Sequence, residues 1–540
     1  MKTKINTSLK SLIATLIITV SVTPSCTKLD ETVYDSIIAE STKLTAKDVD
    51  NIIAPAYTSL RTLYWGWHSY FDTQEECSDV IVTPIRLPRN GWNDGGVYRA
   101  MHMHSWDATQ SHSTGLWTRT FSGINNANRA MYQLEQISGL ENLNVTVAEL
   151  KALRAFYYYI LLDHFRNVPI VEKFDVPVGF LPEQNSAEEV YTFIEKELRE
   201  VIPLLSEENS NVTYGRMNKW AAKMVLAKLY LNAEVYVGTP KWAEALKEAE
   251  EIKGSGKFQL SANYKEPFLT NNESSVEQIF SIPFDEIYGT EFNYHMKTLH
   301  ALSRGTYNLQ AEPWNGSCAI PQFIDTYDKD DKRLPDTWLS GPQFSSTGTP
   351  LILGTTNTQL DYTNRLTEMT GSQENEGLRF IKYEIKSGSL AGLSNDVPFF
   401  RYTDALMIQA ECLLRLQRPD EAAAIVTSIR QRDFAAAPAK ATVTGADLQK
   451  GSSYVYGNYA NGAMVTTEGG ADITFGRFLD ELGWEFAGEH HRRQDLIRFG
   501  VFTKKSWFAH KPNGDHRKYF PIPQAQLDVN SKLKQNSGYN

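Results

Sequence analysis

Residues 401–433 constrain the fold more than any other part of this 540-residue chain, because they have the pattern of two short helices that pack together. The first helix repeats apolar residues three and four positions apart, at Leu406, Ala410, Leu413 and Leu414. This spacing gives a helix one buried stripe. Pro419 then breaks the pattern and is typical of the first turn of a new helix. The inner face of that second helix carries Ala422, Val426 and Ile429. The stretch therefore predicts a helical hairpin.

The alternation of small and large residues in this hairpin is typical of tetratricopeptide repeats. A single hairpin cannot bury its own apolar face, so other hairpins must stack on it. Similar patterns recur in three further pairs of segments: 46–64 with 117–137, 149–165 with 186–205, and 218–236 with 241–252. Ser186 lies three residues before Glu189, which is a signal for a helix start. We predict a mostly α-helical protein in which four hairpins form a scaffold.

The segments between these helices predict the domain organisation. In the N-terminal region, residues 26–253, a loop-rich insertion at about 65–115 interrupts the first hairpin. Residues 254–400 keep no helical period and are too long for a loop of a compact domain, so we predict an irregular lobe that holds a ligand site. Residues 401–540 form a C-terminal region with the fourth hairpin, a helix over 472–498 and an extended tail.

The N-terminus has the features of an export signal. Three lysines, at positions 2, 4 and 10, precede an apolar run that is too short to cross a bilayer permanently. The sequence Thr23-Pro24-Ser25-Cys26 follows and resembles a bacterial lipoprotein box. It predicts a signal peptide over residues 1–25 and a lipid anchor on Cys26. An ordinary secretion signal near a cysteine is the alternative.

Composition argues against nucleic-acid binding and against a bound metal. Without the three N-terminal lysines, the 54 basic residues fall to 51 against 64 acidic ones, a net charge of −13. No basic patch is visible, and four scattered cysteines are too few for a metal cluster or a disulfide framework. His102 and His104 have metal-like spacing but no third ligand. We therefore predict no cofactor; a structural calcium ion at the acidic run Asp325, Asp328, Asp330 and Asp331 is an alternative that lacks the EF-hand pattern.

Charged residues of the C-terminal region invite a catalytic interpretation, but their spacing favours a structural role. Arg401 and Asp404 are three residues apart, and Glu489 precedes Arg492 and Arg493 by three and four. On a helix such residues form neighbouring ion pairs, so we predict pairs that pin helices together. The chain has no Gly-x-Ser-x-Gly or His-Glu-x-x-His motif. Carboxylate pairs exist, but glycoside hydrolysis needs two carboxyl groups at a set separation across a cleft.

Three loop segments, 64–68, 86–96 and 313–316, carry tryptophans that no helical stripe explains. An exposed indole has a flat apolar face that matches the apolar face of a sugar ring, and adjacent polar side chains can pair with sugar hydroxyls. These features predict a carbohydrate site. Its candidate residues are Trp92, Trp314, Asn315, Trp65, Trp67, Arg89, Asp94, Tyr288 and Tyr294. The alternative is that these tryptophans fill the space between the lobe and the helices.

Motifs along nearly the whole chain resemble those of the SusD/RagB nutrient-uptake lipoproteins of Bacteroidetes. They are Trp117 with residues 124–128, residues 153–171, Gly215-Arg216 with residues 221–231, the Arg401-x2-Asp404-x5-Ala410-Glu411 pattern, residues 484–498 and the terminal motif over 521–539. The resemblance implies a SusD-like fold, a surface-exposed lipoprotein of the cell outer membrane, and a SusC-like TonB-dependent transporter as its partner. It also implies that loops near Trp92 and Trp314 build a glycan platform, which makes these two the strongest site candidates.

We therefore predict that the protein is not an enzyme. It captures a nutrient oligosaccharide or polysaccharide at the cell surface and delivers it to the transporter. A peptide-binding member of the same family and a helical-repeat adaptor for another protein are the alternatives, and a glycan-active enzyme is a third.

Overall fold

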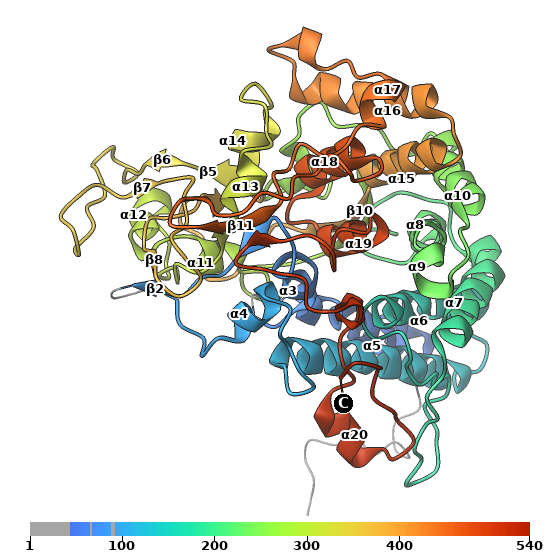
Figure 1. Ribbon diagram of the computed structural model, residues 1–540. Helices are drawn as coiled ribbons and strands as arrows, with labels where there is room; N and C mark the ends of the chain where they lie inside the picture. Colours follow the sequence, from blue (N-terminus) through green and yellow to red (C-terminus); the bar gives the residue numbers. More distant parts are fainter. Residues whose placement is uncertain (1–43, 65–66, 88–91, 540) are drawn as a thin grey trace, which may run out of the picture. The chain divides into compact units, whose positions relative to one another are not determined.

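Paired helices make up one side of the protein. The computed structural model describes residues 44–64, 67–87 and 92–539, and from Thr45 onward these form one compact unit. Figure 1 shows the long helices side by side, away from the irregular part of the chain. The four pairs are α2 (Val49–Thr58) with α5 (Ser111–Glu135), α6 (Leu143–Phe165) with α7 (Ala187–Val201), α8 (Lys219–Leu231) with α10 (Trp242–Gly254), and α15 (Tyr402–Arg415) with α16 (Pro419–Asp433). The predicted fold class and its four hairpins are confirmed.

Helix α6 lies at the centre of the first three pairs, and the fourth pair packs on α8 and α10 through α15. Every side chain over residues 152–165 is buried, and α6 packs against α5, α7 and α8. Gly123 of α5 leaves no room for a Cβ, because the Tyr157 ring lies against its backbone. Helix α7 begins with the predicted capping box, in which Ser186 and Glu189 bind each other's backbone N–H groups.

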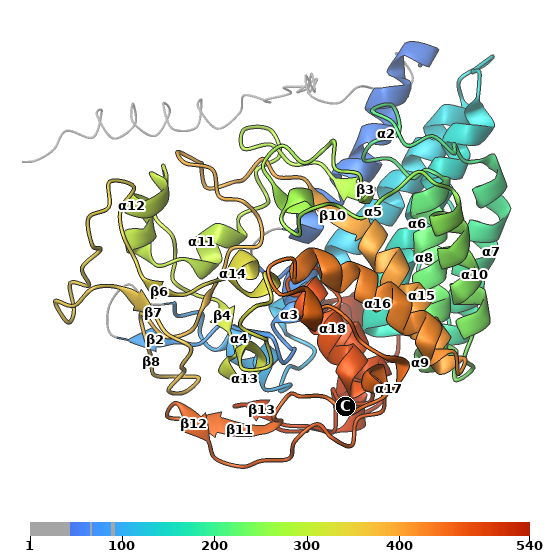
Figure 2. The same ribbon diagram turned by 90° about the horizontal axis from the view of Figure 1, so that it is seen from above.

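The irregular lobe and the early insertion are joined by short strand pairs. In the insertion, β1 (Ile81–Val82) pairs with β4 (Cys318–Ala319), and β2 (Arg86–Leu87) runs parallel to β8 (Ser372–Gln373). Figures 1 and 2 both place α4 (Val97–His102) and β2 on the same side of the molecule as α11 (Tyr294–Thr298). The sequence predicted an insertion and a lobe but not that they pair.

A longer antiparallel pair, β3 (Gln278–Ile282) with β10 (Val397–Arg401), leads from the lobe directly into α15. The other elements of the insertion and lobe are α3 (Tyr70–Glu75), α12 (Arg304–Tyr307), α13 (Pro321–Ile324), α14 (Arg333–Thr337), β5 (Trp338–Leu339), β6 (Gly341–Pro342), β7 (Asp361–Tyr362) and β9 (Arg379–Phe380). All are short, as expected for a segment without a sustained helical or strand period.

The C-terminal region departs from prediction at one helix. The prediction of one helix over 472–498 is wrong, because this segment forms two helices, α18 (Gly476–Phe486) and α19 (Arg492–Arg498). Between them Gly488 and His490 have φ values of 74° and 65°, which end a right-handed helix. Gly488 is also required by space, since the Phe380 ring lies where a Cβ would stand.

The remaining C-terminal elements are α17 (Gly445–Leu448), the three-stranded sheet of β11 (Gly457–Ala460), β12 (Ala463–Met464) and β13 (Trp507–Phe508), and α20 (Gln524–Val529). In the N-terminal region, the short helix α9 (Ala233–Val237) follows α8. The tail that was predicted to be extended thus contains a 3-10 helix over Asp515–Lys518 and the short helix α20. Its end is tied to α6, because the Asn536 side chain donates to the carbonyl oxygens of Phe165 and Phe520, both at 2.9 Å.

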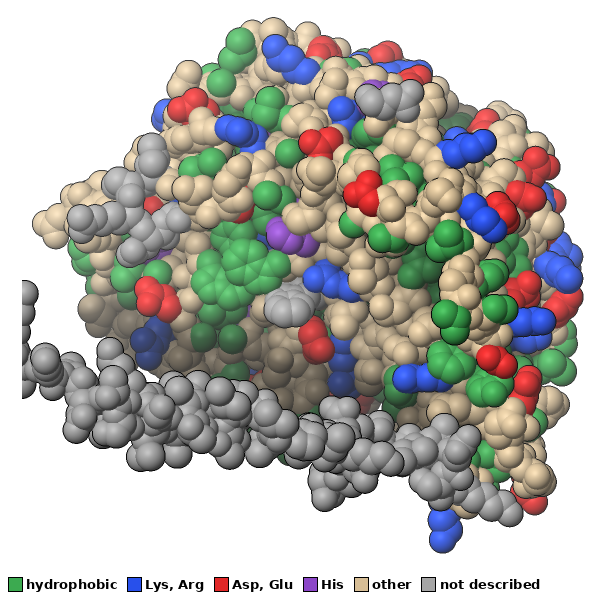
Figure 3. All heavy atoms as spheres, turned by 90° about the horizontal axis from the view of Figure 1, so that it is seen from below, with side chains coloured by type: hydrophobic (Ala, Val, Ile, Leu, Met, Phe, Trp, Pro, Cys, Tyr) green, Lys and Arg blue, Asp and Glu red, His purple; other side chains and the backbone are tan. Residues whose placement is uncertain are grey.

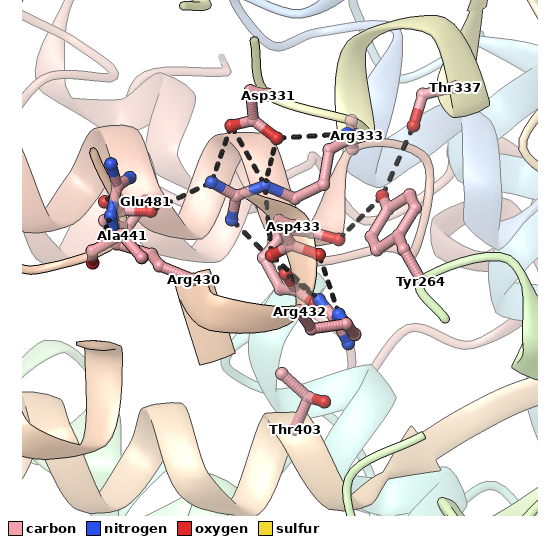
Figure 4. Close-up of polar contacts among 12 residues, drawn as sticks. Tyr264, Asp331, Arg333, Thr337, Thr403, Arg430, Arg432, Asp433, Ala441 and Glu481 are labelled. Carbon is pink, nitrogen blue, oxygen red and sulfur yellow. Dashed lines mark hydrogen bonds and ion pairs between the residues drawn. The ribbon is translucent and has the colours of Figure 1, made fainter. Parts of the chain in front are cut away.

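A buried ion-pair network joins the lobe to the C-terminal helices (Figure 4). Arg333 of α14 pairs with Asp331 at 2.7 Å, Glu481 at 3.2 Å and Glu485 at 3.3 Å, and all four side chains are about 1 % exposed or less. Glu485 also pairs with Arg432 at 2.7 Å and with Arg401 at 2.9 Å. Burial disfavours its charge, but the three guanidinium groups outweigh burial and hold the pKa of Glu485 below its ordinary value. The predicted structural role of these charges is confirmed.

The predicted partners within that network are wrong. Arg401 ends β10 instead of lying on a helix with Asp404, and it pairs with Glu489 at 2.7 Å. Asp404 pairs with Lys228 at 3.0 Å. The break between α18 and α19 likewise separates Glu489 from Arg492 and Arg493. Arg492 pairs with Asp79 at 2.6 Å, and Arg493 pairs with Asp163 at 2.7 Å.

The candidate metal residues are buried in the protein or paired with lysine. His102 and His104 are buried at and just after the end of α4, and His104 bonds the carbonyl oxygen of Cys77 at 2.7 Å. In the acidic run, Asp328 and Asp330 both bind Lys440 at 2.7 Å. Among the described residues no group of three His, Cys, Asp or Glu side chains is arranged to hold a metal ion, and Cys77, Cys318 and Cys412 are free and buried. None of the described helices is long and apolar enough to cross a membrane.

Glu75→Gln is expected to reduce the loss of stability between about pH 5 and pH 8. Burial raises the pKa of Glu75 to about 8, although the backbone N–H groups of Gly488 and His490 oppose this shift. Over this range Glu75 keeps its proton in the folded protein but has lost it in the unfolded chain. As the pH rises, the free energy of unfolding therefore falls by up to about 1.4 kcal/mol per pH unit. Urea unfolding across this range measures the slope. The exposed Glu188→Gln is the control, and equal slopes for wild type and Glu75→Gln would contradict the assignment.

Candidate functional site: a tryptophan cluster at the junction of insertion and lobe

Three tryptophans, Trp67 and Trp92 of the insertion and Trp314 of the lobe, meet where the two segments pair. The Trp67 ring stacks on Trp92, with centroids 4.7 Å apart and planes at 30°, and on Trp314, at 4.9 Å and 29°. The Trp92 and Trp314 centroids are 6.4 Å apart. Trp67 and Trp314 are partly exposed, whereas Trp92 is only 5 % exposed. We call these three residues the tryptophan cluster.

Trp92 is held firmly beneath the two exposed rings. Its indole N–H donates to Asp94 Oδ2 at 2.5 Å, and its ring meets the Tyr98 ring edge-on at 5.5 Å. On another side the ring packs on Gly316, where an added Cβ would lie 2.6 Å from it. A glycine is therefore required at position 316 for the two segments to approach this closely.

A buried ion triad supports Tyr98 from below. Lys297 Nζ donates to Asp72 Oδ1 at 2.6 Å and to Glu76 Oε1 at 2.7 Å, and it lies 4.1 Å from the centroid of the Tyr98 ring. The Tyr98 hydroxyl donates to the other oxygen of Asp72 at 2.8 Å. These hydrogen bonds and ion pairs fix Tyr98, and with it the ring that meets Trp92 edge-on, in one position.

Polar groups border the cluster. His68 follows Trp67, is partly buried, and accepts a hydrogen bond at its backbone oxygen from Arg119. Burial lowers the pKa of His68, Lys297 and Arg119 lower it further, and Asp72 and Asp94 oppose them. Its imidazole is thus neutral at pH 7, with one donor and one acceptor nitrogen. Asp94 is partly exposed beside it.

This arrangement can hold a ligand with a flat apolar face and hydroxyl groups around it. The indole faces of Trp67 and Trp314 supply stacking, and His68, Asp94 and Arg119 supply donors and acceptors. The face drawn in Figure 3 carries a compact hydrophobic patch with a histidine beside it and charged side chains around it.

The structure brings together some of the sequence-predicted residues and separates others. Trp67, Trp92, Trp314 and Asp94 meet, but Trp92 is covered by its neighbours instead of being displayed. Asn315 is fully buried, with no hydrogen-bond partner for its side chain, and cannot reach a surface ligand. Tyr294 is 3 % exposed and packs in the core on Phe71, at a centroid distance of 3.9 Å.

Tyr288 is 87 % exposed in the turn closed by Asp285 and Gly289, and its described contacts do not include the cluster. Trp65, Arg89 and the lipidation candidate Cys26 lie outside the described residues. Sequence reasoning missed His68 and Arg119. The position of His68 directly after Trp67 was an available signal, but nothing in the sequence pointed to Arg119, which lies on the helix α5.

Comparison with known families establishes the ancestry of the chain. The model of the SusD family matches residues 230–539, and a second model, described as starch-binding and associating with the outer membrane, matches residues 29–231. The chain belongs to the SusD family. Starch-binding protein SusD of Bacteroides thetaiotaomicron is 25 % identical to this SusD family member, over 88 % of the chain and 86 % of the relative. SusD-like protein P25 of Formosa agariphila is 24 % identical, over 78 % of the chain and 79 % of the relative.

Solved structures share the fold of this SusD family member. Surface glycan-binding protein A from Bacteroides thetaiotaomicron, in complex with laminarihexaose, superposes with a TM-score of 0.68 and 21 % identity over 91 % of this chain and 100 % of its own. A SusD superfamily protein from Parabacteroides distasonis gives a TM-score of 0.70 and 19 % identity over 92 % and 100 %. The SusD-like fold that was predicted from the sequence is confirmed.

Proposed function

We propose that this SusD family member binds a nutrient oligosaccharide or polysaccharide at the cell surface through its tryptophan cluster. The observation that carries the proposal is the stack of Trp67 and Trp314, two partly exposed indoles held at 4.9 Å on a buried third ring. A flat apolar surface with donors and acceptors at its edge suits pyranose rings. Relatives named for starch binding and for glycan binding support the same ligand class.

The protein acts by binding and not by cleavage. The carboxylates around the cluster support this. Asp72 and Glu76 are fully buried and share one ion-pair partner, Lys297. Asp94 is partly exposed, but it is engaged as the acceptor of the Trp92 indole N–H. A glycosidase needs two carboxyl groups on opposite sides of the scissile bond, one of them able to give a proton. Paired, inaccessible carboxylates have no such role.

Capture leads to delivery through the outer membrane. A lipid anchor on Cys26 tethers the protein to the membrane, and a SusC-like TonB-dependent transporter receives the glycan. The export-type N-terminus and the family description, which names association with the outer membrane, support this localisation. Affinity is modest, because a ligand that must be handed over has to dissociate quickly.

The test is an array of glycans and peptides probed with the soluble protein that begins after Cys26. Binding to one class of polysaccharide, without release of smaller products after incubation, is the expected result. Binding to peptides alone would favour the peptide-binding alternative, and product release would reveal an enzyme. A protein that bound neither class would be better described as a helical adaptor.

A further inference from the structure

A cavity with a volume of about 850 Å³ and a lining of both polar and apolar residues lies in the lobe. It is lined by residues of the 300–312 and 351–355 segments and by Glu374. Helix α12 supplies Arg304 and Gly305 to the lining, strand β8 ends directly before Glu374, and Figures 1 and 2 place both elements in the lobe. The volume falls within the range of small-ligand sites.

The cavity contains a buried imidazole–carboxylate pair. The backbone N–H of Leu302 donates to His300 Nδ1 at 3.1 Å, so the ring carries its proton on Nε2 and donates it to Glu374 Oε2 at 3.2 Å. The Thr355 hydroxyl donates to the other oxygen of Glu374. His300 and Glu374 are only 4 % and 6 % exposed. A carboxylate accepts about four hydrogen bonds, so Glu374 keeps acceptor capacity for hydroxyl groups of a ligand.

The remaining lining suits a neutral sugar. Leu302, Leu309 and Leu351 give the cavity apolar surface, and Arg304 and Glu312 are exposed polar residues in its wall. Together with Glu374 these charges leave one excess negative charge. The lining therefore offers no excess positive charge to bind the carboxylate of a uronic acid or a sulfate group.

The cavity and the tryptophan cluster share one stretch of backbone. The backbone N–H of Asn315 donates to the carbonyl oxygen of Leu299 at 2.8 Å, and Leu299 directly precedes His300. Glu312 in the cavity wall stands two residues before Trp314, which limits the separation of their Cα atoms to about 7 Å. A glycan that stacks on Trp314 therefore has the cavity within a short distance.

We propose that this cavity is a second sugar subsite, which takes a neutral sugar unit of the same glycan chain that stacks on the tryptophan cluster. The inference rests on the proposed function. It predicts that long neutral oligosaccharides bind more tightly than short ones, because only the long ones occupy both places.

The test compares hexasaccharides with disaccharides by calorimetry, using the laminari-, malto-, manno- and xylo-oligosaccharide series. Gly354→Trp fills the cavity, since Gly354 lines it and a Cβ there meets nothing within 4 Å. Glu374→Gln removes the charge but keeps a hydrogen-bonding group of the same size. Both variants should weaken hexasaccharide binding about tenfold, to the level of the disaccharide, and leave disaccharide binding unchanged.

Two variants serve as matched controls. Gly254→Trp adds an indole at the end of α10, where a Cβ also meets nothing within 4 Å, and Glu384→Gln neutralises a lobe carboxylate that accepts a hydrogen bond from Thr270 N. Neither should change hexasaccharide binding. Wild-type hexasaccharide affinity in both Gly354→Trp and Glu374→Gln would overturn the subsite while leaving the proposed function intact. Failure of the wild-type protein to bind any of these neutral hexasaccharides would also overturn the subsite, whereas failure to bind any glycan on the array would overturn the proposed function as well.

Discussion

Trp67→Ala is expected to weaken binding to the glycan identified on the array by about 30-fold or more. Trp67 is the central ring of the cluster, so its removal takes away one stacking face and also the contact that orients Trp314. Loss of a tryptophan at the centre of a binding surface costs about 2 kcal/mol or more, which corresponds to this factor. Isothermal titration calorimetry, or electrophoresis in gels that contain the polysaccharide, measures the change.

The matched control for this prediction is Trp242→Ala. Trp242 is a partly exposed tryptophan on α10, 5.3 Å from the guanidinium of Arg415, and lies on the helical scaffold. We expect its removal to leave glycan affinity unchanged. Trp67→Phe keeps an aromatic face and should give an intermediate loss, while thermal unfolding verifies that each variant is folded. A Trp67→Ala protein with wild-type affinity would show that the glycan binds elsewhere.

Glu485→Gln is expected to lower the free energy of unfolding by about 3–5 kcal/mol, the typical cost of removing one partner from a buried ion pair. Glu485 is fully buried between Arg333, Arg401 and Arg432, at 3.3, 2.9 and 2.7 Å. Glutamine keeps the shape but leaves these guanidinium groups without their shared negative charge. Urea unfolding at neutral pH measures the change in the free energy of unfolding, from the midpoint of the transition and the dependence of the free energy on urea concentration.

Glu421→Gln provides the control for the network. Glu421 pairs with Arg418 at 2.6 Å, but both side chains are well exposed, at 58 % and 44 %. Exposed pairs contribute about 0–1 kcal/mol, so this variant should unfold close to wild type. A Glu485→Gln protein that is no less stable than Glu421→Gln would refute the view that the network holds the lobe to the C-terminal helices.

Local sequence patterns predicted the helices well, because the forces that set them act over a few residues. The stripe at Leu406, Ala410 and Leu413 lies in α15, and the Ser186–Glu189 box begins α7. The prediction failed where distant residues intervened. The helix expected over 472–498 is interrupted at Gly488, which has a positive φ and against which the Phe380 ring from the lobe packs.

In the candidate site, too, local sequence predicted some features and contacts between distant residues decided the others. Glycine- and asparagine-rich turns around Trp67, Trp92 and Trp314 indicated that these rings are not part of a helical stripe, and all three meet in the cluster. Which ring is covered was not predictable, because burial of Trp92 depends on Gly316 and Tyr98, which approach from other segments. Tyr294 was misassigned for a similar reason, since its partner Phe71 lies far away in sequence.

The sequence by itself determined the helical hairpins, the family and the residue types of the site, because periodicity and motifs are properties of short stretches. Only the tertiary structure decided which indole faces are open, which charges pair and how the cavity at Glu374 is formed. Those features arise where the insertion, the lobe and the C-terminal helices converge, and contact between distant segments leaves no periodic signal in a single chain.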